Sequence, residues 1–569
     1  MKIIRTILFL VCLLSVNIAV EANVPIIPAE ELRPGMTGYA KTVIKGVTIE
    51  TFDVEILGVT GSEASGRSIL VKASGPVIER SGGIAQGMSG SPVYIDGKLA
   101  GAVAYGKAFS DPKYCFLTPI EEMLALFDES TPRPSAFLPK NTPLMVSGFT
   151  PDAVDYLNDK LKSFKLKAYG VPAGKGDLSN VKLEPGSSIG VSLARGDMEI
   201  GAIGTVTWKG DDGKILAFGH PFLQRGAADY FMTNAWIFAS VPNIESAFKV
   251  GAIGDVVGKV VQDRSVGIGG VLNEYPHIVP LFVSVTDKDR GYHKTCSVQL
   301  ITDEALVPTL VDGITYSAVG KTMDRKGGGT SKVKFKITAQ GKDGKPITIQ
   351  RENMFYHANN IAKNTNEELA YACLMLMKNK FEQTTIFDVN VDVEMSSENA
   401  IAELLSAKMS NKDLKPGQVV PITLELQPYR SEKITRTINF KIPSKQKPGP
   451  MHLVVRGGSA YGWMVNLLKK QEEAGNKITL GEKKKSLDEF IQEFNVSDSN
   501  NDIVVDILPS YGKKSVPPVV AEDDKQVGDA AARGTANIGA MMRGSKYKQK
   551  FPMNFIVSGE LELTAQVGE

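Results

Sequence analysis

Residues 82–105 read GGIAQGMSGSPVYIDGKLAGAVAY, and this stretch carries the strongest signals for fold and function in the sequence. Glycines lie on both sides of Ser89, so the backbone can turn there with positive φ and leave N–H groups unpaired. Such N–H groups can hold a developing oxyanion while the serine hydroxyl faces a carbonyl carbon. PVYI and LAGAVAY then flank Asp96-Gly97, a strong signal for a tight β-hairpin. From composition alone, the segment is either a nucleophile turn or an ordinary glycine-serine turn between strands.

The flanking residues predict a small β-barrel over residues 23–130. Phe52, Val54 and Ile56 alternate with acidic residues, which is the period of a half-buried strand. Further strands are expected over residues 68–73 and 114–117.

A short helix is expected directly after the last of these strands. Thr118 is the predicted N-cap, Pro119 the first helical residue, and Glu121 the closing member of a capping box. The order is therefore serine turn, hairpin, strand and terminal helix.

The segment GGIAQGMSGSP, residues 82–92, resembles the nucleophile segment of the SpoIVB (sporulation stage IV B) serine peptidases, a branch of the chymotrypsin-like clan. In that clan the nucleophile turn leads into the last hairpin of a β-barrel that ends in a helix. The resemblance implies that Ser89 is the nucleophile and that the N–H groups of Gly87 and Ser89 form the oxyanion hole. It covers roughly residues 28–300.

His220 lies at the end of a predicted strand, in AFGHPF, and is one of five histidines. A histidine between glycine and proline is more often structural. Here the preceding GTVTW strand resembles the histidine segment of the same peptidases, which implies that His220 is the general base. Because Ser89 precedes His220, the resemblance implies two chymotrypsin-like β-barrels in permuted order, with the site in the cleft between them. The expected order is a serine-bearing barrel, a linker or strap over residues 131–186, and a histidine-bearing barrel over residues 187–305.

The third member of a catalytic triad is not where the resemblance places it. The family has an aspartate upstream of the serine, whereas this chain has Ser74-Gly75-Pro76 there. Asp229 and Asp263 follow His220, and we expect Asp263 to approach the imidazole. Two alternatives remain open: a backbone carbonyl orients the ring, which gives a Ser–His dyad, or these aspartates are turn or salt-bridge residues.

The N-terminus has the pattern of an export signal over residues 1–22. Lys2 and Arg5 precede an apolar run, and Val20-Glu21-Ala22 provides a small-residue cleavage site. The run is shorter than the roughly 20 residues that span a bilayer, so no integral span is expected after cleavage. We therefore expect an extracytoplasmic protein, periplasmic or secreted; an uncleaved anchor is the alternative.

Charge and cysteine content indicate which ligands and partners to expect. The formal net charge is only +2, which gives no case for nucleic acid. No cysteine–histidine spacing is typical of a metal site, so neither a metal nor another cofactor is expected. The remaining cysteines, Cys115, Cys296 and Cys373, are expected to be core thiols, with one long-range disulfide as the alternative. The oligomeric state is left open.

The C-terminal half carries no catalytic pattern. Residues 306–384 predict an α/β connecting region with a helix over 359–381, and residues 385–569 a β-sandwich-like domain with a long polar loop over 511–550. Taken together, the chain is expected to be mostly β and to be an exported serine endopeptidase acting on proteins or peptides. The alternative is a catalytically inactive, peptidase-like scaffold or binding protein of the cell envelope.

Overall fold

The computed structural model describes residues 24–568 except 63–65, 107–109, 129–141, 175, 179–180, 244–246, 412, 459–485 and 508–546. The expected signal peptide, the proline-rich start of the expected linker and most of the polar loop lie outside the described residues. Two compact units make up the chain. The first contains residues 1–148, 161–193 and 199–277, and the second contains residues 149–160, 194–198 and 278–569.

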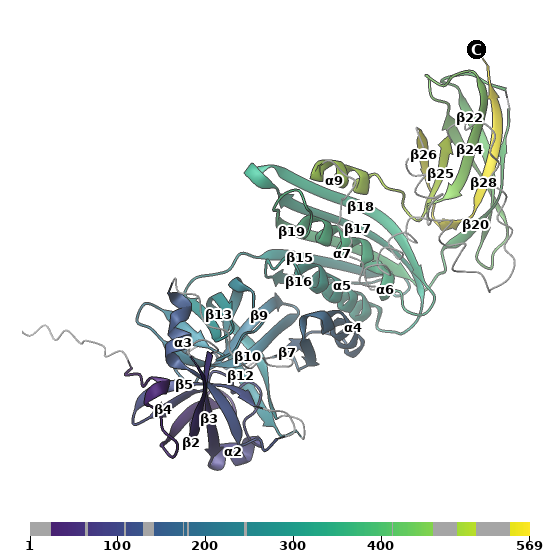
Figure 1. Cartoon of the computed structure of the whole chain (residues 1–569). Coiled ribbons are helices and arrows are strands. Elements are labelled where there is room, and N and C mark those ends of the chain that lie inside the picture. The colour runs from purple at the N-terminus through teal and green to yellow at the C-terminus, as the bar shows by residue number, and fades with distance from the viewer. Residues whose placement is uncertain are drawn as a thin grey trace, which may run out of the picture. The chain divides into compact units, whose positions relative to one another are not determined.

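A closed six-stranded barrel forms the N-terminal part of the first unit, with the strand order β1-β2-β3-β6-β5-β4 (Figure 1). Its strands are β1 (Thr37–Val43), β2 (Ile49–Ser62), β3 (Gly66–Ser74), β4 (Pro92–Ile95), β5 (Lys98–Gly106) and β6 (Tyr114–Pro119). Phe52, Val54 and Ile56 are buried, and the acidic residues between them are exposed, as the alternation predicted. The expectation of a mostly β protein is confirmed.

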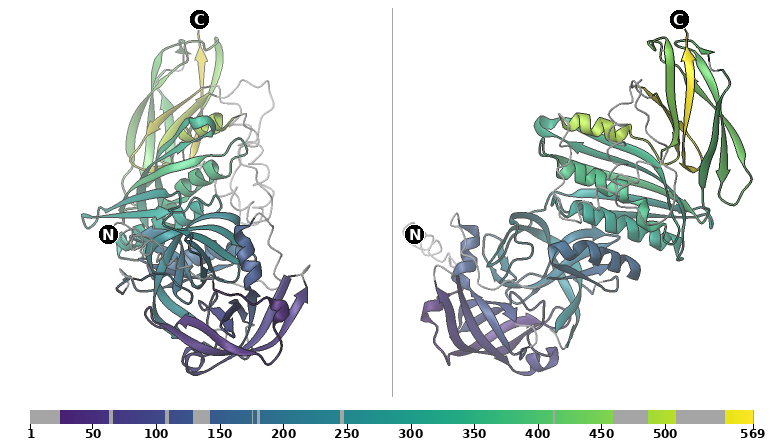
Figure 2. Two further views of the ribbon diagram at one scale, coloured as in Figure 1. Left: turned by 90° about the vertical axis from the view of Figure 1, so that its left-hand side faces the viewer. Right: turned by 45° about the vertical axis from the view of Figure 1, so that its right-hand side comes forward.

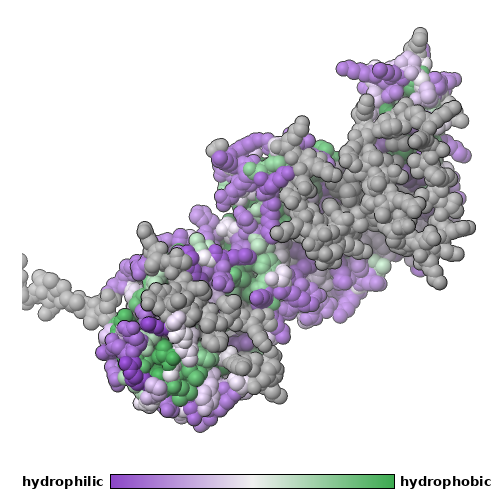
Figure 3. Space-filling model, in the orientation of Figure 1, coloured by the Kyte–Doolittle hydropathy of each residue, from purple (hydrophilic) through white to green (hydrophobic). Residues whose placement is uncertain are grey.

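Short helices lie between and beside the barrel strands. The helix α2 (Pro76–Ser81) precedes the serine turn, and α3 (Ile120–Leu124) follows β6. The turn between β4 and β5 has positive φ at both Asp96 (51°) and Gly97 (74°), which is the type I′ geometry that Asp-Gly favours. Short 3-10 helices are η1 (Ala29–Glu31) and η2 (Ala125–Phe127). Figure 3 shows a patch of hydrophobic residues on this part of the chain, with hydrophilic residues to its left.

A second ring of six paired strands completes most of the first unit. Each strand pairs with the next in the order β9-β12-β13-β14-β11-β10, and β10 also pairs with β9. The members are β9 (Ser188–Gly196), β10 (Glu199–Lys209), β11 (Lys214–Ala217), β12 (Gly226–Val241), β13 (Phe248–Arg264) and β14 (Gly267–Leu272). On the far side of β10 lie β7 (Thr142–Ser147) and β8 (Leu166–Gly170). A further 3-10 helix is η3 (Lys162–Phe164).

The second unit contains a sheet with helices on one face (Figures 1 and 2). Its strands are ordered β18-β17-β19-β15-β16. Their bounds are β15 (Val279–Asp287), β16 (Tyr292–Leu300), β17 (Gly329–Gln340), β18 (Pro346–His357) and β19 (Thr385–Ser396), with η4 (Lys342–Gly344) between β17 and β18. The helices are α4 (Pro151–Leu161), α5 (Val307–Met323), α6 (Ala362–Thr365) and α7 (Glu367–Met377). The single helix expected over 359–381 is two helices, and α5 was not predicted.

The rest of the second unit consists of two further sheets, ordered β23-β22-β20-β27 and β21-β28-β24-β25-β26. Side chains from both sheets form one hydrophobic cluster. The elements are β20 (Ile401–Met409), β21 (Asp413–Leu414), β22 (Val419–Pro428), β23 (Ile434–Lys441), β24 (Gly449–Gly457), α9 (Leu487–Asn495), β25 (Asp502–Ile507), β26 (Lys548–Pro552), β27 (Ile556–Ser558) and β28 (Glu560–Val567).

Cys115, Cys296 and Cys373 are free and buried, which confirms the prediction of core thiols. Burial raises the pKa of Cys115 and of Cys373 to about 12. Within the described part of the chain, no helix is both long and apolar enough to cross a membrane.

Candidate active site

Ser89 lies in the turn between α2 and β4 and is partly exposed to solvent. Gly87 and Gly90 on either side of it have φ of 92° and 94°, a region that L-residues with a side chain rarely adopt. Neighbouring N–H groups of this turn donate to backbone carbonyls: Gln86 to Ala247, Met88 to Ala85 and Gly90 to Val103. The N–H groups of Gly87 and Ser89 donate to none of the residues that the structure describes. The two amides predicted for the oxyanion hole are therefore the two that the turn leaves unpaired.

The peptide units that carry these two amides are fixed from their carbonyl ends. The Gln86 carbonyl accepts from the Lys249 N–H at 2.9 Å, and the Met88 carbonyl accepts from the Ser91 N–H at 2.9 Å. In a trans peptide the N–H points away from the C=O. Each bond therefore sets the direction of the following N–H, that of Gly87 or of Ser89.

The segment that carries His220 packs directly against the serine turn. A Cβ built on Gly90 would lie 1.9 Å from the Thr205 carbonyl oxygen and 2.5 Å from the Phe218 nitrogen. Thr205 joins the two segments, because its N–H donates to the Ser89 carbonyl at 2.8 Å and its carbonyl accepts from the Phe218 N–H at 3.3 Å. The structure thus brings together the two chain segments that the sequence singled out, although 130 residues separate Ser89 from His220.

The histidine turn has an unusual backbone. Phe218 and Gly219 have φ of 69° and 64°, and a buried aromatic residue at positive φ is an outlier that persists only where its surroundings hold it. One such restraint is the Thr118 hydroxyl, which donates to the Gly219 carbonyl at 2.6 Å. The prediction of Thr118 as N-cap of α3 is therefore wrong: Pro119 occupies the N-cap, without a side-chain cap, and the hydroxyl is used by the histidine turn instead.

His220 is 7% exposed, and its ring lies edge-on to that of Phe218. Its Nδ1 is 2.8 Å from the Pro221 carbonyl oxygen. Since a carbonyl can only accept, Nδ1 carries the proton and Nε2 is the basic nitrogen. Burial lowers the pKa of His220 to about 4, although the bond to Pro221 raises it. The Ser89 hydroxyl has no hydrogen bond to a described residue, so the Ser89–His220 bond is not formed in this arrangement.

Asp263 is buried and serves the backbone that follows His220. Its carboxylate accepts from the N–H groups of Phe222 at 2.8 Å and Leu223 at 2.7 Å. The N–H groups of Gln224 and Arg225 also bond to it and lower its pKa, but burial is larger and raises it. Asp229, the other acidic residue considered, instead accepts from His277, with 2.8 Å between Oδ2 and Nδ1.

Lys249 is a residue of this region that the sequence did not single out. It is 1% exposed, and its Nζ donates to the hydroxyls of Thr42 at 3.1 Å and Thr205 at 3.3 Å. Burial lowers the pKa of Lys249 to about 7. Its sequence context, FKVGAIG, gave no signal, because strand alternation does not tell which lysine faces a core.

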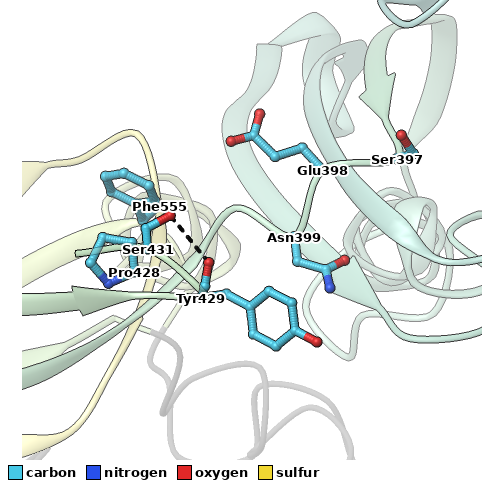
Figure 4. A pocket seen from close by; sticks show the side chains of 7 residues that line it. All are labelled: Ser397, Glu398, Asn399, Pro428, Tyr429, Ser431 and Phe555. Atoms are coloured by element: carbon cyan, nitrogen blue, oxygen red, sulfur yellow. Dashed lines mark hydrogen bonds between the residues drawn. The ribbon is translucent and has the colours of Figure 1, made fainter. Parts of the chain in front are cut away.

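A separate pocket of about 320 Å³ lies in the second unit (Figure 4). It offers no serine–histidine or cysteine–histidine pair, and Glu398 is its one carboxylate among the lining residues. These residues are Ser397, Glu398, Asn399, Pro428, Tyr429, Ser431 and Phe555. The described residues also contain no group of three or more histidine, cysteine, aspartate and glutamate side chains that could hold a metal ion.

Residues 13–124 match the model of the family SpoIVB peptidase S55. The match includes the serine turn and ends at the last residue of α3, whereas His220 lies outside it. It confirms, for this part of the chain, the resemblance that the residues around Ser89 predicted, and it supports a peptidase. Comparison with curated proteins and comparison with solved structures each gave no match.

Proposed function

We propose that this protein is an exported serine endopeptidase in which Ser89 attacks the scissile carbonyl and His220 accepts the serine proton. The observation that carries the proposal is the pair of unpaired N–H groups in the serine turn, that of Gly87 and that of the partly exposed Ser89 itself. Donors that are fixed before the reaction stabilise the oxyanion without reorganisation, which is often the largest contribution to catalysis. The match to a peptidase family over the same turn supports the proposal.

The proposed reaction begins when a side-chain rotation of Ser89 brings its hydroxyl to Nε2 of His220. Catalytic hydrogen bonds are often open in the absence of substrate and tighten when it binds. Nε2 takes the proton as the oxygen attacks, the carbonyl oxygen becomes an oxyanion on the two N–H groups, and the protonated ring returns the proton to the leaving amine. Water then hydrolyses the acyl-enzyme by the same route.

The Pro221 carbonyl takes the orienting role in this proposal. It holds the Nδ1–H tautomer of His220, while Asp263 fixes the backbone from Phe222 to Arg225 that follows the ring. A neutral carbonyl stabilises the imidazolium less than a carboxylate does, and loss of the carboxylate from a triad costs on the order of 10⁴ in turnover. We therefore propose a slow peptidase, with Asp263 acting on His220 through the backbone. The permuted barrel arrangement and an extracytoplasmic location belong to the same proposal.

Covalent labelling tests the proposal. The chain without the expected signal peptide, residues 1–22, is incubated with a fluorophosphonate probe and the labelled residue is identified by mass spectrometry. We expect one adduct, on Ser89, that is absent from Ser89→Ala and from heat-denatured protein and that forms far more slowly in His220→Gln. If correctly folded protein forms no adduct, the peptidase proposal is refuted and an inactive scaffold is favoured.

A further inference from the structure

The carbonyl of Gly87 is bonded to a buried polar chain that the proposed reaction does not use. The Thr205 hydroxyl donates to this carbonyl at 2.9 Å and itself accepts from Lys249 Nζ at 3.3 Å. Thr205 and Thr42 are fully buried, and the aliphatic part of Lys249 lies against Gly87, where an added Cβ would be 3.1 Å from its Cδ.

Both peptide units that meet at Gly87 therefore depend on Lys249. The main-chain N–H of Lys249 holds the Gln86 carbonyl at 2.9 Å, which directs the Gly87 N–H. Its side chain, through Thr205, holds the Gly87 carbonyl. One residue on β13 thus fixes the orientation of the first oxyanion donor from both sides.

The number of partners matches a neutral amine. An –NH₂ group has two donors, and the structure supplies two acceptors, the hydroxyls of Thr42 and Thr205. An –NH₃⁺ group has a third donor, for which the described residues offer no acceptor. The elements packed around the amine are β1, β10, β12 and the serine turn, and none of their described residues places a charged group against it. Burial alone lowers the pKa of Lys249 to about 7, so both forms are accessible near neutral pH.

We propose that Lys249 and Thr205 are positioning residues of the oxyanion hole, and that Lys249 holds the Gly87 peptide units in place as a neutral amine. Protonation puts a charge without a counter-ion behind Gly87, and the serine turn loosens to solvate it. The chain thereby has an acid-sensitive control of the nucleophile turn that is separate from the titration of His220. This inference rests on the proposed function.

The rate of fluorophosphonate labelling between pH 5 and pH 9 tests the inference. In wild type we expect a plateau above pH 7 and a fall of about tenfold per pH unit below it, as for loss of one essential deprotonated group. In Lys249→Met the plateau should extend down to pH 5, because the pKa of His220, about 4, lies below the range measured. Lys259→Met is the matched control, since Lys259 is on the same strand but pairs with Glu274 at 3.1 Å, and it should keep the fall near pH 7. A fall near pH 7 that persists in Lys249→Met overturns the inference.

A second pair of variants tests the role of Thr205. Thr205→Val keeps the shape and removes the hydroxyl, and we expect labelling at pH 8 to slow at least about tenfold; Thr205→Ser should restore the rate to within about threefold of wild type. Equal rates for all three proteins refute the positioning role.

Amide hydrogen exchange separates failure of this inference from failure of the proposed function. If wild type is not labelled at any pH, the peptidase proposal fails. Exchange in residues 82–91, corrected for its intrinsic pH dependence, should still rise at least about threefold below pH 7 in wild type and stay constant in Lys249→Met. The same pH dependence in both proteins overturns the inference whether or not Ser89 reacts.

Discussion

Gly90 is the point at which the serine turn and the histidine turn touch, so Gly90→Ala should force them apart. The new Cβ would lie 1.9 Å from the Thr205 carbonyl oxygen, and real Cβ atoms essentially never come closer than 3.0 Å to another atom. The two backbones must therefore separate by about 1.1 Å, the difference between these distances. Two buried hydrogen bonds of 2.8 Å cross this contact, from the Thr205 N–H to the Ser89 carbonyl and from the Thr207 hydroxyl to the Gly90 carbonyl. A separation of this size breaks both.

The expected loss of stability follows from these bonds and from the backbone. Each buried group left unpaired costs about 1 to 3 kcal/mol, and alanine at positive φ costs about 1 to 2 kcal/mol. Gly90→Ala should therefore lower the free energy of unfolding by at least about 3 kcal/mol. Gly97→Ala is the matched control: φ there is also positive, at 74°, but an added Cβ meets nothing within 4 Å. It should cost only the backbone strain.

Denaturant unfolding followed by tryptophan fluorescence measures this difference, because two of the three tryptophans, Trp208 and Trp236, lie in the first unit. Gly90→Ala should unfold at lower denaturant than Gly97→Ala, with a difference of at least about 2 kcal/mol from the two bonds. It should also lose fluorophosphonate labelling, which Gly97→Ala keeps. If the two variants are equally stable and equally labelled, the contact between the two turns is refuted.

Three further predictions concern the same region. His220→Gln should remove a loss of stability that wild type shows in acid. The pKa of His220 in the folded protein, about 4, lies below the ordinary 6.5, so the free energy of unfolding of wild type falls by on the order of 3 kcal/mol between pH 6.5 and pH 4. The difference between the pH dependences of unfolding of the two proteins measures this loss. Lys249→Met should likewise remove a loss of unfolding free energy, on the order of 3 kcal/mol between pH 10 and pH 7, because the pKa of Lys249 in the folded protein, about 7, lies below the ordinary 10.5. If variant and wild type have the same pH dependence of stability, the lysine is not buried in the core. Thr118→Val leaves the Gly219 carbonyl unpaired and should cost about 1 to 3 kcal/mol in the same assay; a neutral result would mean that this bond does not hold the histidine turn.

Local signals in the sequence were sufficient for several elements. Asp96-Gly97 forms the type I′ turn that the dipeptide predicted, and Ile422, Leu424 and Leu426 are buried as their alternation requires. Ser486 and Glu489 have the spacing of a capping box, and the helix α9 begins there: the Ser486 hydroxyl accepts from the Glu489 N–H at 3.1 Å. In each case the residues that determine the structure are neighbours in the chain.

Features that depend on distant residues could not be predicted in the same way. Thr118 has the local pattern of an N-cap, but its hydroxyl bonds to Gly219, 101 residues away. Lys249 reads as an ordinary strand lysine, and only the packing of β1 and β10 around it shows that it is buried. Asp263 was expected near the imidazole, and its bonds go to the backbone after it. The sequence identified the segments of the candidate site, whereas the partners of their polar atoms required the fold.

The buried thiols have a consequence for the environment in which the chain is proposed to work. Disulfide exchange requires a thiolate, and a cysteine whose pKa is about 12 is ionised to about one part in 10⁴ at pH 8. Cys115, Cys296 and Cys373 lie on β6, β16 and α7 and are unbridged and buried, and burial also raises the pKa of Cys296, to about 11. In the proposed exported protein, the burial of these three thiols would slow their oxidation in an oxidising compartment.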